Sequence, residues 1–121
     1  MITLTEIEKY LNYKFDSDWE NTKEYLDFQS KYISYLRYIF NKQKYRIIKI
    51  NKNHFEFSLF VYANNKLVYF SISDVRYYKN EWYNNILIRT VNSENDYIGN
   101  ENYYTNLKSL INNIEFITKE N

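Results

Sequence analysis

Apolar side chains recur every three or four positions between residues 19 and 40, and this spacing predicts one long helix with a single buried face. Ser17 and Glu20 form a capping box, which places the start of the helix just before the apolar stripe. The stripe consists of Trp19, Tyr25, Leu26, Tyr32, Ile33, Leu36, Ile39 and Phe40.

Two shorter helices are predicted near the ends of the chain. Thr3 and Glu6 form another capping box, and the apolar positions that follow indicate a helix ending near Asn12. The last predicted helix spans Tyr103–Ile114, where apolar residues again share one face. That face consists of Leu107, Leu110, Ile111 and Ile114.

The hydrophobic period changes to two in the centre of the chain, which predicts strands. The odd positions from 55 to 61 are Phe, Phe, Leu and Val, an alternation typical of a half-buried strand. Asn64–Asn65 stands between two such runs and predicts a hairpin turn, because asparagine tolerates positive φ. A long polar loop is expected at Asn92–Asn102. The four predicted strands are Tyr45–Asn51, Phe55–Val61, Lys66–Asp74 and Asn85–Val91.

The order of these elements predicts a single α+β domain over residues 1–121. Consecutive strands with short connections pair antiparallel, because a parallel pair would need a crossover. We therefore expect a four-stranded antiparallel meander sheet with two N-terminal helices and one C-terminal helix packed on one face. The other face is expected to be solvated or to form a binding surface. Its side chains would be Phe60, Tyr62, Tyr69, Ser71 and Ser73.

The composition is rich in tyrosine and nearly neutral. Aromatic residues make up 21% of the chain, with 15 Tyr among them. Tyrosine is favoured at interfaces, but AT-rich codons would also produce much Tyr, Asn, Ile and Lys, so both explanations stay open. The AT-rich bias points to a low-GC bacterium or to one of its phages or plasmids. The 16 basic and 15 acidic residues show neither the basic excess of a dedicated nucleic-acid binder nor the acidic excess of a DNA mimic.

Several function classes are disfavoured by what the sequence lacks. There is no cysteine, so there is no thiol nucleophile, disulfide or Cys-based zinc site. The only glycine is Gly99, which disfavours a glycine-rich phosphate loop, and no cofactor motif is present. The first residues do not resemble a signal peptide, and no apolar stretch approaches the roughly 20 residues needed to span a bilayer. We expect a cytoplasmic protein without a cofactor or metal ion.

Candidate catalytic groups are few and isolated. His54, the only histidine, has no obvious carboxylate beside it, whereas a metal site or a catalytic base would need such partners. Ser71 and Ser73 share one face of a predicted strand, as in the Ser-x-Ser strand of ADP-ribosyltransferases. Arg46 and Glu81 would supply the other groups of that enzyme, but the order of elements fits its fold poorly.

Paired carboxylates for general acid–base catalysis would be Glu94 with Asp96, or Glu81 with Asp96. Acidic residues in asparagine-rich loops are ordinarily solvated or cap the local backbone. The sequence therefore favours a protein that is not an enzyme.

A nucleic-acid-binding accessory protein remains the alternative interpretation. The stretch Lys42–Lys52 carries basic residues on both sides of Tyr45 and would follow a phosphate backbone. Tyr45, Tyr69 and Tyr77 would then stack on bases, as in single-strand binders. The balanced net charge argues against this function, although a local basic patch can be hidden within a balanced total.

Residues 73–104 contain features that folding alone does not require. Arg89 falls in a predicted half-buried strand and needs a partner, for which Asp74 and Asp96 are the candidates. These three residues are expected to form a structural staple that holds the polar loop to the sheet. The same segment is rich in the residue types that dominate binding hot spots. The predicted partner-binding patch consists of Arg76, Tyr77, Trp82, Tyr83, Tyr97 and Tyr103.

This segment also resembles a pattern in small uncharacterised proteins of phages and integrative elements in low-GC bacteria. The resemblance rests on Asp-Val-Arg-Tyr at 74–77, Trp82, Ile-Leu-Ile-Arg-Thr at 86–90 and the run from Asp96 to Tyr104. It covers about a quarter of the chain, and the pattern has two adjacent glycines where this chain has Gly99 and Asn100.

The resemblance implies an anti-defence inhibitor similar to anti-CRISPR proteins. Such an inhibitor would bind a CRISPR effector nuclease or its guide complex and occlude it, in the cytoplasm of the bacterial host. Dimerisation through an exposed strand edge is also open.

Overall fold

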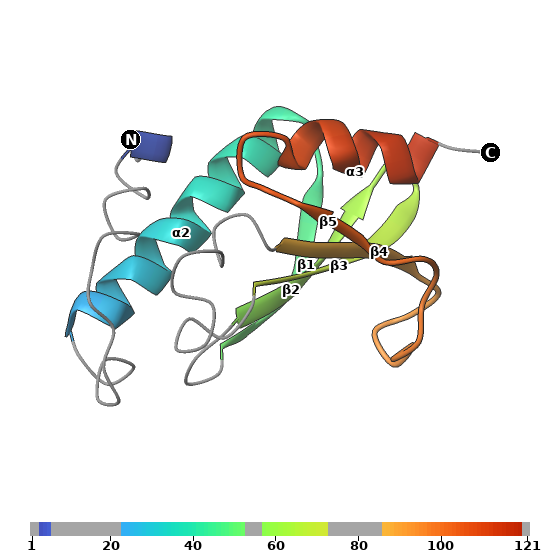
Figure 1. Ribbon diagram of the computed structural model, residues 1–121, viewed down its shortest axis with the longest axis horizontal. Helices are drawn as coiled ribbons and strands as arrows, with labels where there is room; N and C mark the ends of the chain where they lie inside the picture. Colours follow the sequence, from blue (N-terminus) through green and yellow to red (C-terminus); the bar gives the residue numbers. More distant parts are fainter. Residues whose placement is uncertain (1–2, 6–22, 53–56, 73–85, 120–121) are drawn as a thin grey trace.

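The computed structural model describes residues 3–5, 23–52, 57–72 and 86–119. These residues form an antiparallel sheet of five strands and two long helices, shown in Figure 1. The elements are α2 (Lys23–Lys42), β1 (Arg46–Lys52), β2 (Phe57–Ala63), β3 (Lys66–Ile72), β4 (Ile86–Val91), β5 (Tyr103–Thr105) and α3 (Leu110–Lys119). The predicted α+β class is confirmed.

The sheet is a meander in which the strands pair in the order β1-β2-β3-β4-β5, each antiparallel to its neighbour. Asn64 and Asn65 form the two-residue turn between β2 and β3, with φ angles of 51° and 67°. Asparagine tolerates this left-handed backbone, so the predicted hairpin turn is confirmed. In β1 the register shifts between Ile47 and Lys49, which marks a β-bulge in this edge strand.

The prediction of four strands and a helix starting at Tyr103 was wrong. Tyr103–Thr105 pairs with β4 as a fifth strand, because aromatic and β-branched residues favour extended backbone and the edge of β4 is available. The helix begins only at Leu110 and continues beyond the predicted end at Ile114. Its start is prepared by Asn106, whose side-chain oxygen accepts a hydrogen bond of 2.9 Å from the Ser109 N–H.

The N-terminal helices are described only in part. Leu4 and Thr5 are helical, whereas the other residues of the first predicted helix and the Ser17 capping box lie outside the described residues. The described part of α2 agrees with its predicted apolar stripe. Tyr32 and Leu36 are fully buried, and Phe40 is 1% exposed.

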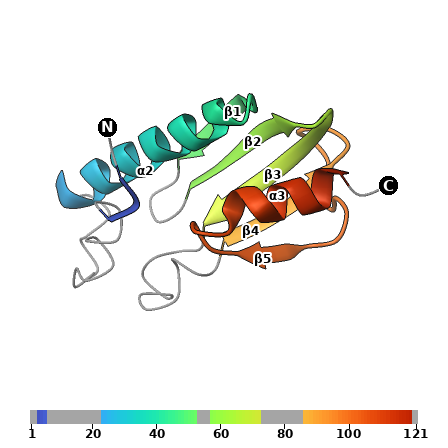
Figure 2. The same cartoon turned by 90° about the horizontal axis from the view of Figure 1, so that it is seen from above.

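The core lies between the helices and one face of the sheet. Both helices lie on the same side of the sheet, and the view from above separates them, with α2 beside β1 and α3 above the later strands (Figures 1 and 2). We call the covered side the inner face and the opposite side the outer face. The strand side chains buried in the core are Leu59, Val61, Ala63, Val68, Phe70, Ile72, Ile86 and Ile88.

A polar cluster fastens α3 to the start of β1 and to the β2–β3 turn. The Tyr45 hydroxyl donates a hydrogen bond of 2.6 Å to the Glu115 carboxylate, and the Asn64 amide donates to the same oxygen. Asn64 also donates to the Thr118 hydroxyl at 2.9 Å, and Lys119 pairs with Glu115 at 3.0 Å. Burial and the Glu115 hydrogen bond raise the pKa of Tyr45 well above its usual range. The donors, Tyr45 first, lower the pKa of Glu115 to about 2.

We expect Glu115→Gln to lower the free energy of unfolding by about 1 kcal/mol at neutral pH, because the hydrogen bonds lose their charged acceptor. A carboxylate with a lowered folded pKa stabilises the fold above its unfolded pKa of 4.5, and the contribution disappears as the pH falls towards 2. Urea unfolding between pH 2 and pH 7 measures both effects. In the substituted protein the free energy of unfolding should fall less steeply as the pH is lowered.

Glu94→Gln is the matched control, because Glu94 is an exposed loop carboxylate. It should change stability by less than about 0.5 kcal/mol. If both variants show the same pH dependence as the unmodified protein, the Glu115 cluster does not stabilise the fold.

Candidate functional site

A row of two aromatic rings with a cation at each end crosses the outer face of the sheet. Lys49 lies opposite Phe60, Phe60 opposite Tyr69, and Tyr69 opposite Arg89. The Phe60 and Tyr69 ring centroids are 5.4 Å apart, and the Arg89 guanidinium carbon lies 4.8 Å from the Tyr69 centroid. These four residues form what we call the aromatic row. The rings form its centre and a cation stands at each end.

Neighbouring outer-face rows extend this surface along the strands. Arg46 lies opposite Tyr62, with its guanidinium carbon 6.0 Å from the ring centroid. Tyr62 is 41% exposed. At the other end of the sheet, Tyr104 lies opposite Leu87 and is 64% exposed. The outer face thus presents accessible rings on both sides of the aromatic row.

The loop of residues 92–102 is held in one shape by Asp96. One Asp96 carboxylate oxygen accepts the Asn92 N–H at 3.0 Å, and the other accepts the Gly99 N–H at 2.8 Å. The Asp96 N–H in turn donates to the Ser93 carbonyl at 3.1 Å. The backbone hydrogen bonds from Asn92 and Gly99 hold the pKa of Asp96 below its usual range. Both oxygens of Asp96 are therefore occupied by the loop itself.

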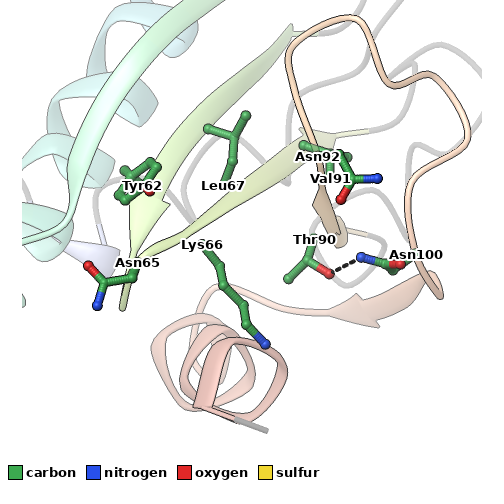
Figure 3. A pocket seen from close by; sticks show the side chains of 8 residues that line it. All are labelled: Tyr62, Asn65, Lys66, Leu67, Thr90, Val91, Asn92 and Asn100. Carbon is green, nitrogen blue, oxygen red and sulfur yellow. Dashed lines mark hydrogen bonds between the residues drawn. The ribbon is translucent and has the colours of Figure 1, made fainter. Parts of the chain in front are cut away.

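The neck of the loop is closed by Thr90 and Asn100. The Asn100 N–H donates to the Thr90 carbonyl at 2.9 Å, and the Asn100 side chain donates to the Thr90 hydroxyl at 2.8 Å (Figure 3). Gly99 has a φ of +65°, and a Cβ there would lie 2.9 Å from Arg89 Cδ and 3.0 Å from Val91 Cγ1. A glycine is required because the loop backbone lies directly on these two outer-face side chains.

Arg89 joins the loop to the sheet. Its guanidinium donates to the Tyr97 carbonyl at 3.2 Å and to the Asn102 side-chain oxygen at 3.5 Å. The Arg89 Nε atom is buried and has no hydrogen-bond partner among the described residues. The predicted staple had Arg89 paired with Asp74 or Asp96. Arg89 and Asp96 both hold the loop: Asp96 accepts from backbone N–H groups, and Arg89 donates to one backbone carbonyl and one side chain. Asp74 lies outside the described residues.

The tip of this fixed loop carries two exposed apolar side chains. Tyr97 is 83% exposed and Ile98 is 85% exposed. The loop extends from the end of β4 on the side away from the helices, as Figure 1 shows. Because Asp96 and Arg89 fix the backbone on either side, the tip is presented with little conformational freedom.

Two shallow pockets adjoin the loop. The first, of about 360 Å³, lies at the hairpin end of the sheet and is shown in Figure 3, with Tyr62 and Leu67 on one side of the strands and Lys66 and Thr90 on the other. The second, of about 240 Å³, lies between the aromatic row and the loop. Its walls include Asn51 and Ser58 from the sheet and Glu94, Asn95, Asp96 and Tyr97 from the loop.

Several predicted site residues lie outside the described part of the chain. They are His54, Ser73, Asp74, Arg76, Tyr77, Glu81, Trp82 and Tyr83. Of the predicted partner-binding patch, the structure describes Tyr97 and Tyr103. Tyr97 is exposed at the loop tip, whereas Tyr103 packs edge-on against Phe116, with ring centroids 5.9 Å apart. These two tyrosines therefore do not share one surface.

Other chemical predictions are changed by the geometry. Tyr45 is only 7% exposed and bonds Glu115, so its ring is not available to stack on a base. Each oxygen of Asp96 accepts a backbone N–H, and these hydrogen bonds lower its pKa, which makes Asp96 a weaker general base. Phe60 was predicted on the outer face and lies there. Ile98 was missed as a site residue, because no pattern marked it.

Metal and membrane features are absent from the described residues. Within residues 3–5, 23–52, 57–72 and 86–119, no three His, Cys, Asp or Glu side chains gather as metal ligands. Neither described long helix has the length and apolar content to cross a membrane. Comparison of the chain with protein-family models, curated proteins and solved structures gives no match.

We expect Gly99→Ala to lower the free energy of unfolding by about 1–2 kcal/mol, because an alanine at φ +65° is strained and its Cβ meets Arg89 and Val91. Gly99→Asn separates the two causes, since asparagine tolerates this φ but carries the same Cβ. The asparagine variant should be destabilised less than the alanine variant, yet measurably. Chemical denaturation measures both, and a neutral alanine variant would contradict the close approach of the loop to the sheet.

Proposed function

We propose that this protein is a phage or mobile-element inhibitor that binds a host defence complex and occludes it stoichiometrically. The observation that carries the proposal is the loop tip, where Tyr97 and Ile98 are more than four-fifths exposed although the backbone beside them is fixed. Large apolar side chains held in this way lose little conformational entropy on binding. They are suited to enter a pocket on a protein partner.

The surroundings of the tip fit a protein interface. The tip adjoins the pocket beside the aromatic row, so an apolar anchor is bordered by polar and charged groups. Interfaces of standard size bury about 800 Å² per partner and combine an apolar centre with a polar rim. The tip would form the centre, and the outer-face cations and loop amides would form the rim.

The kind of partner is proposed from the sequence resemblance to anti-defence proteins. We expect the partner to be a CRISPR effector nuclease or its guide complex, met in the cytoplasm of the bacterial host. Inhibition would follow from occupancy and not from turnover.

We expect Tyr97→Ser with Ile98→Ser to abolish inhibition of the purified effector–guide complex in a target-cleavage assay. The unsubstituted protein should inhibit fully at about one molecule per complex. Tyr38→Ser is the matched control, because Tyr38 is a partly exposed tyrosine on α2. It should leave inhibition unchanged.

Full inhibition at much less than one inhibitor molecule per effector complex, together with a mass change on the effector, would show that the protein is an enzyme. Equal inhibition by the tip variant and the control would exclude the loop tip as the anchor. No inhibition of any CRISPR effector tested would exclude this class of target.

A further inference from the structure

The described strands carry positive charge without negative charge. Their basic residues are Arg46, Lys49, Lys52, Lys66 and Arg89, and none of the residues in β1 to β5 is Asp or Glu. The chain as a whole has 16 basic and 15 acidic residues. Three of the basic strand residues, Arg46, Lys49 and Arg89, lie in the outer-face rows, whereas Lys66 lies opposite the buried Ala63 on the inner side. The near-zero net charge therefore conceals an outer sheet face whose local charge is positive. Such a surface attracts polyanions at short range even in a neutral protein.

The outer-face tyrosines follow a diagonal across the sheet. Tyr62 is on β2, Tyr69 lies one row further on β3, and Tyr104 lies one row beyond that on β5. The Cα atoms of diagonal neighbours on adjacent strands, such as Tyr62 and Tyr69, lie about 7–8 Å apart. The Arg46 guanidinium lies over the first ring and the Arg89 guanidinium over the second, so each of these two rings has a cation beside it.

We propose that the outer face of the sheet binds single-stranded nucleic acid. Tyr62 and Tyr104, the more exposed rings, stack on bases, and Arg46, Lys49 and Arg89 neutralise phosphates. This combination of aromatic side chains and a basic track is how proteins bind single strands without reading their sequence. The inference does not depend on the protein partner proposed above, because it uses the sheet and not the loop tip.

Single-stranded nucleic acid fits this surface better than an acidic peptide does. An acidic peptide would use the cations but would bring carboxylates against exposed rings, whose faces are electron-rich. Bases have flat faces that stack on such rings. Duplex DNA fits poorly because its bases are stacked inside the helix, and because the 92–102 loop extends from this side of the sheet (Figure 1).

Two neighbouring carboxylates limit the surface. Asp96 is already occupied by backbone N–H groups, whereas Glu94 lines the pocket beside the aromatic row and is exposed. Glu94 therefore repels a phosphate near Arg89. This gives the proposal a gain-of-function test, since removal of the Glu94 charge should strengthen binding.

The experiment is a fluorescence anisotropy titration of the full chain with labelled oligothymidylate and oligouridylate at several salt concentrations. The logarithm of the association constant should fall linearly with the logarithm of salt, with a slope of about −2 for three cations. Lys49→Ser should reduce the magnitude of that slope by about 0.7. Tyr62→Ala should weaken binding about tenfold, and Glu94→Gln should strengthen it about twofold.

Lys108→Ser is the matched control, because Lys108 is an exposed lysine outside the strands. It should leave the salt slope nearly unchanged. The proposal is overturned if neither oligonucleotide binds at low salt, if Lys49→Ser and Lys108→Ser act equally, or if polyglutamate binds as tightly as the oligonucleotides. A misfolded variant cannot produce the gain expected from Glu94→Gln.

The two proposals fail separately. The Tyr97 and Ile98 double variant should keep its oligonucleotide affinity while it loses inhibition of the effector complex. If that double variant loses oligonucleotide binding while Tyr62→Ala keeps it, the nucleic acid binds the loop tip and the outer-face proposal is overturned.

Discussion

Burial of one face of the sheet beneath α2 and α3 is the constraint on which the rest of the structure depends. Strand side chains alternate between faces, so each apolar residue sent into the core leaves its neighbours on the outer face. Val68 and Phe70 are buried, and Tyr69 between them turns outward. The outer face could therefore collect cations and rings without any cost to the core. The polar cluster around Glu115 keeps α3 in place over the inner face of the sheet.

Much of the fold could be predicted from the sequence, because long periodic segments fix the class and the pairing. The α2 stripe and the asparagine turn are local signals, and both agree with the structure. The fifth strand could not be predicted from hydrophobic alternation, because a strand of three residues is too short to show an alternating pattern. Tyr103 follows a polar loop and precedes apolar residues at helical spacing, so it was assigned to the helix. The missed signal was Asn106, whose side chain caps the turn that precedes the helix.

The candidate site was only partly predictable, for a different physical reason. Some of its contacts join residues that are distant in sequence, and others join a side chain to a backbone group. A sequence pattern reveals neither kind of contact. Arg89 meets the Tyr97 carbonyl and the Tyr69 ring, and its candidate partner Asp74 lies outside the described residues. Asn100 stands where the resembled pattern has glycine, and it closes the loop through Thr90. The tip itself, Tyr97 and Ile98, is defined by the turns that Asp96 imposes.

The bulge in β1 has a consequence for how this molecule can assemble. An unbroken edge strand offers a row of free backbone groups to which a foreign strand can be added, whereas a bulge twists the edge and interrupts that row. The opposite edge, β5, is only three residues long. Both borders of the sheet are thus poor templates for fibril growth or for strand exchange between copies. The exposed tyrosines Tyr62, Tyr97 and Tyr104 therefore belong to a protein whose sheet edges do not favour the addition of further strands.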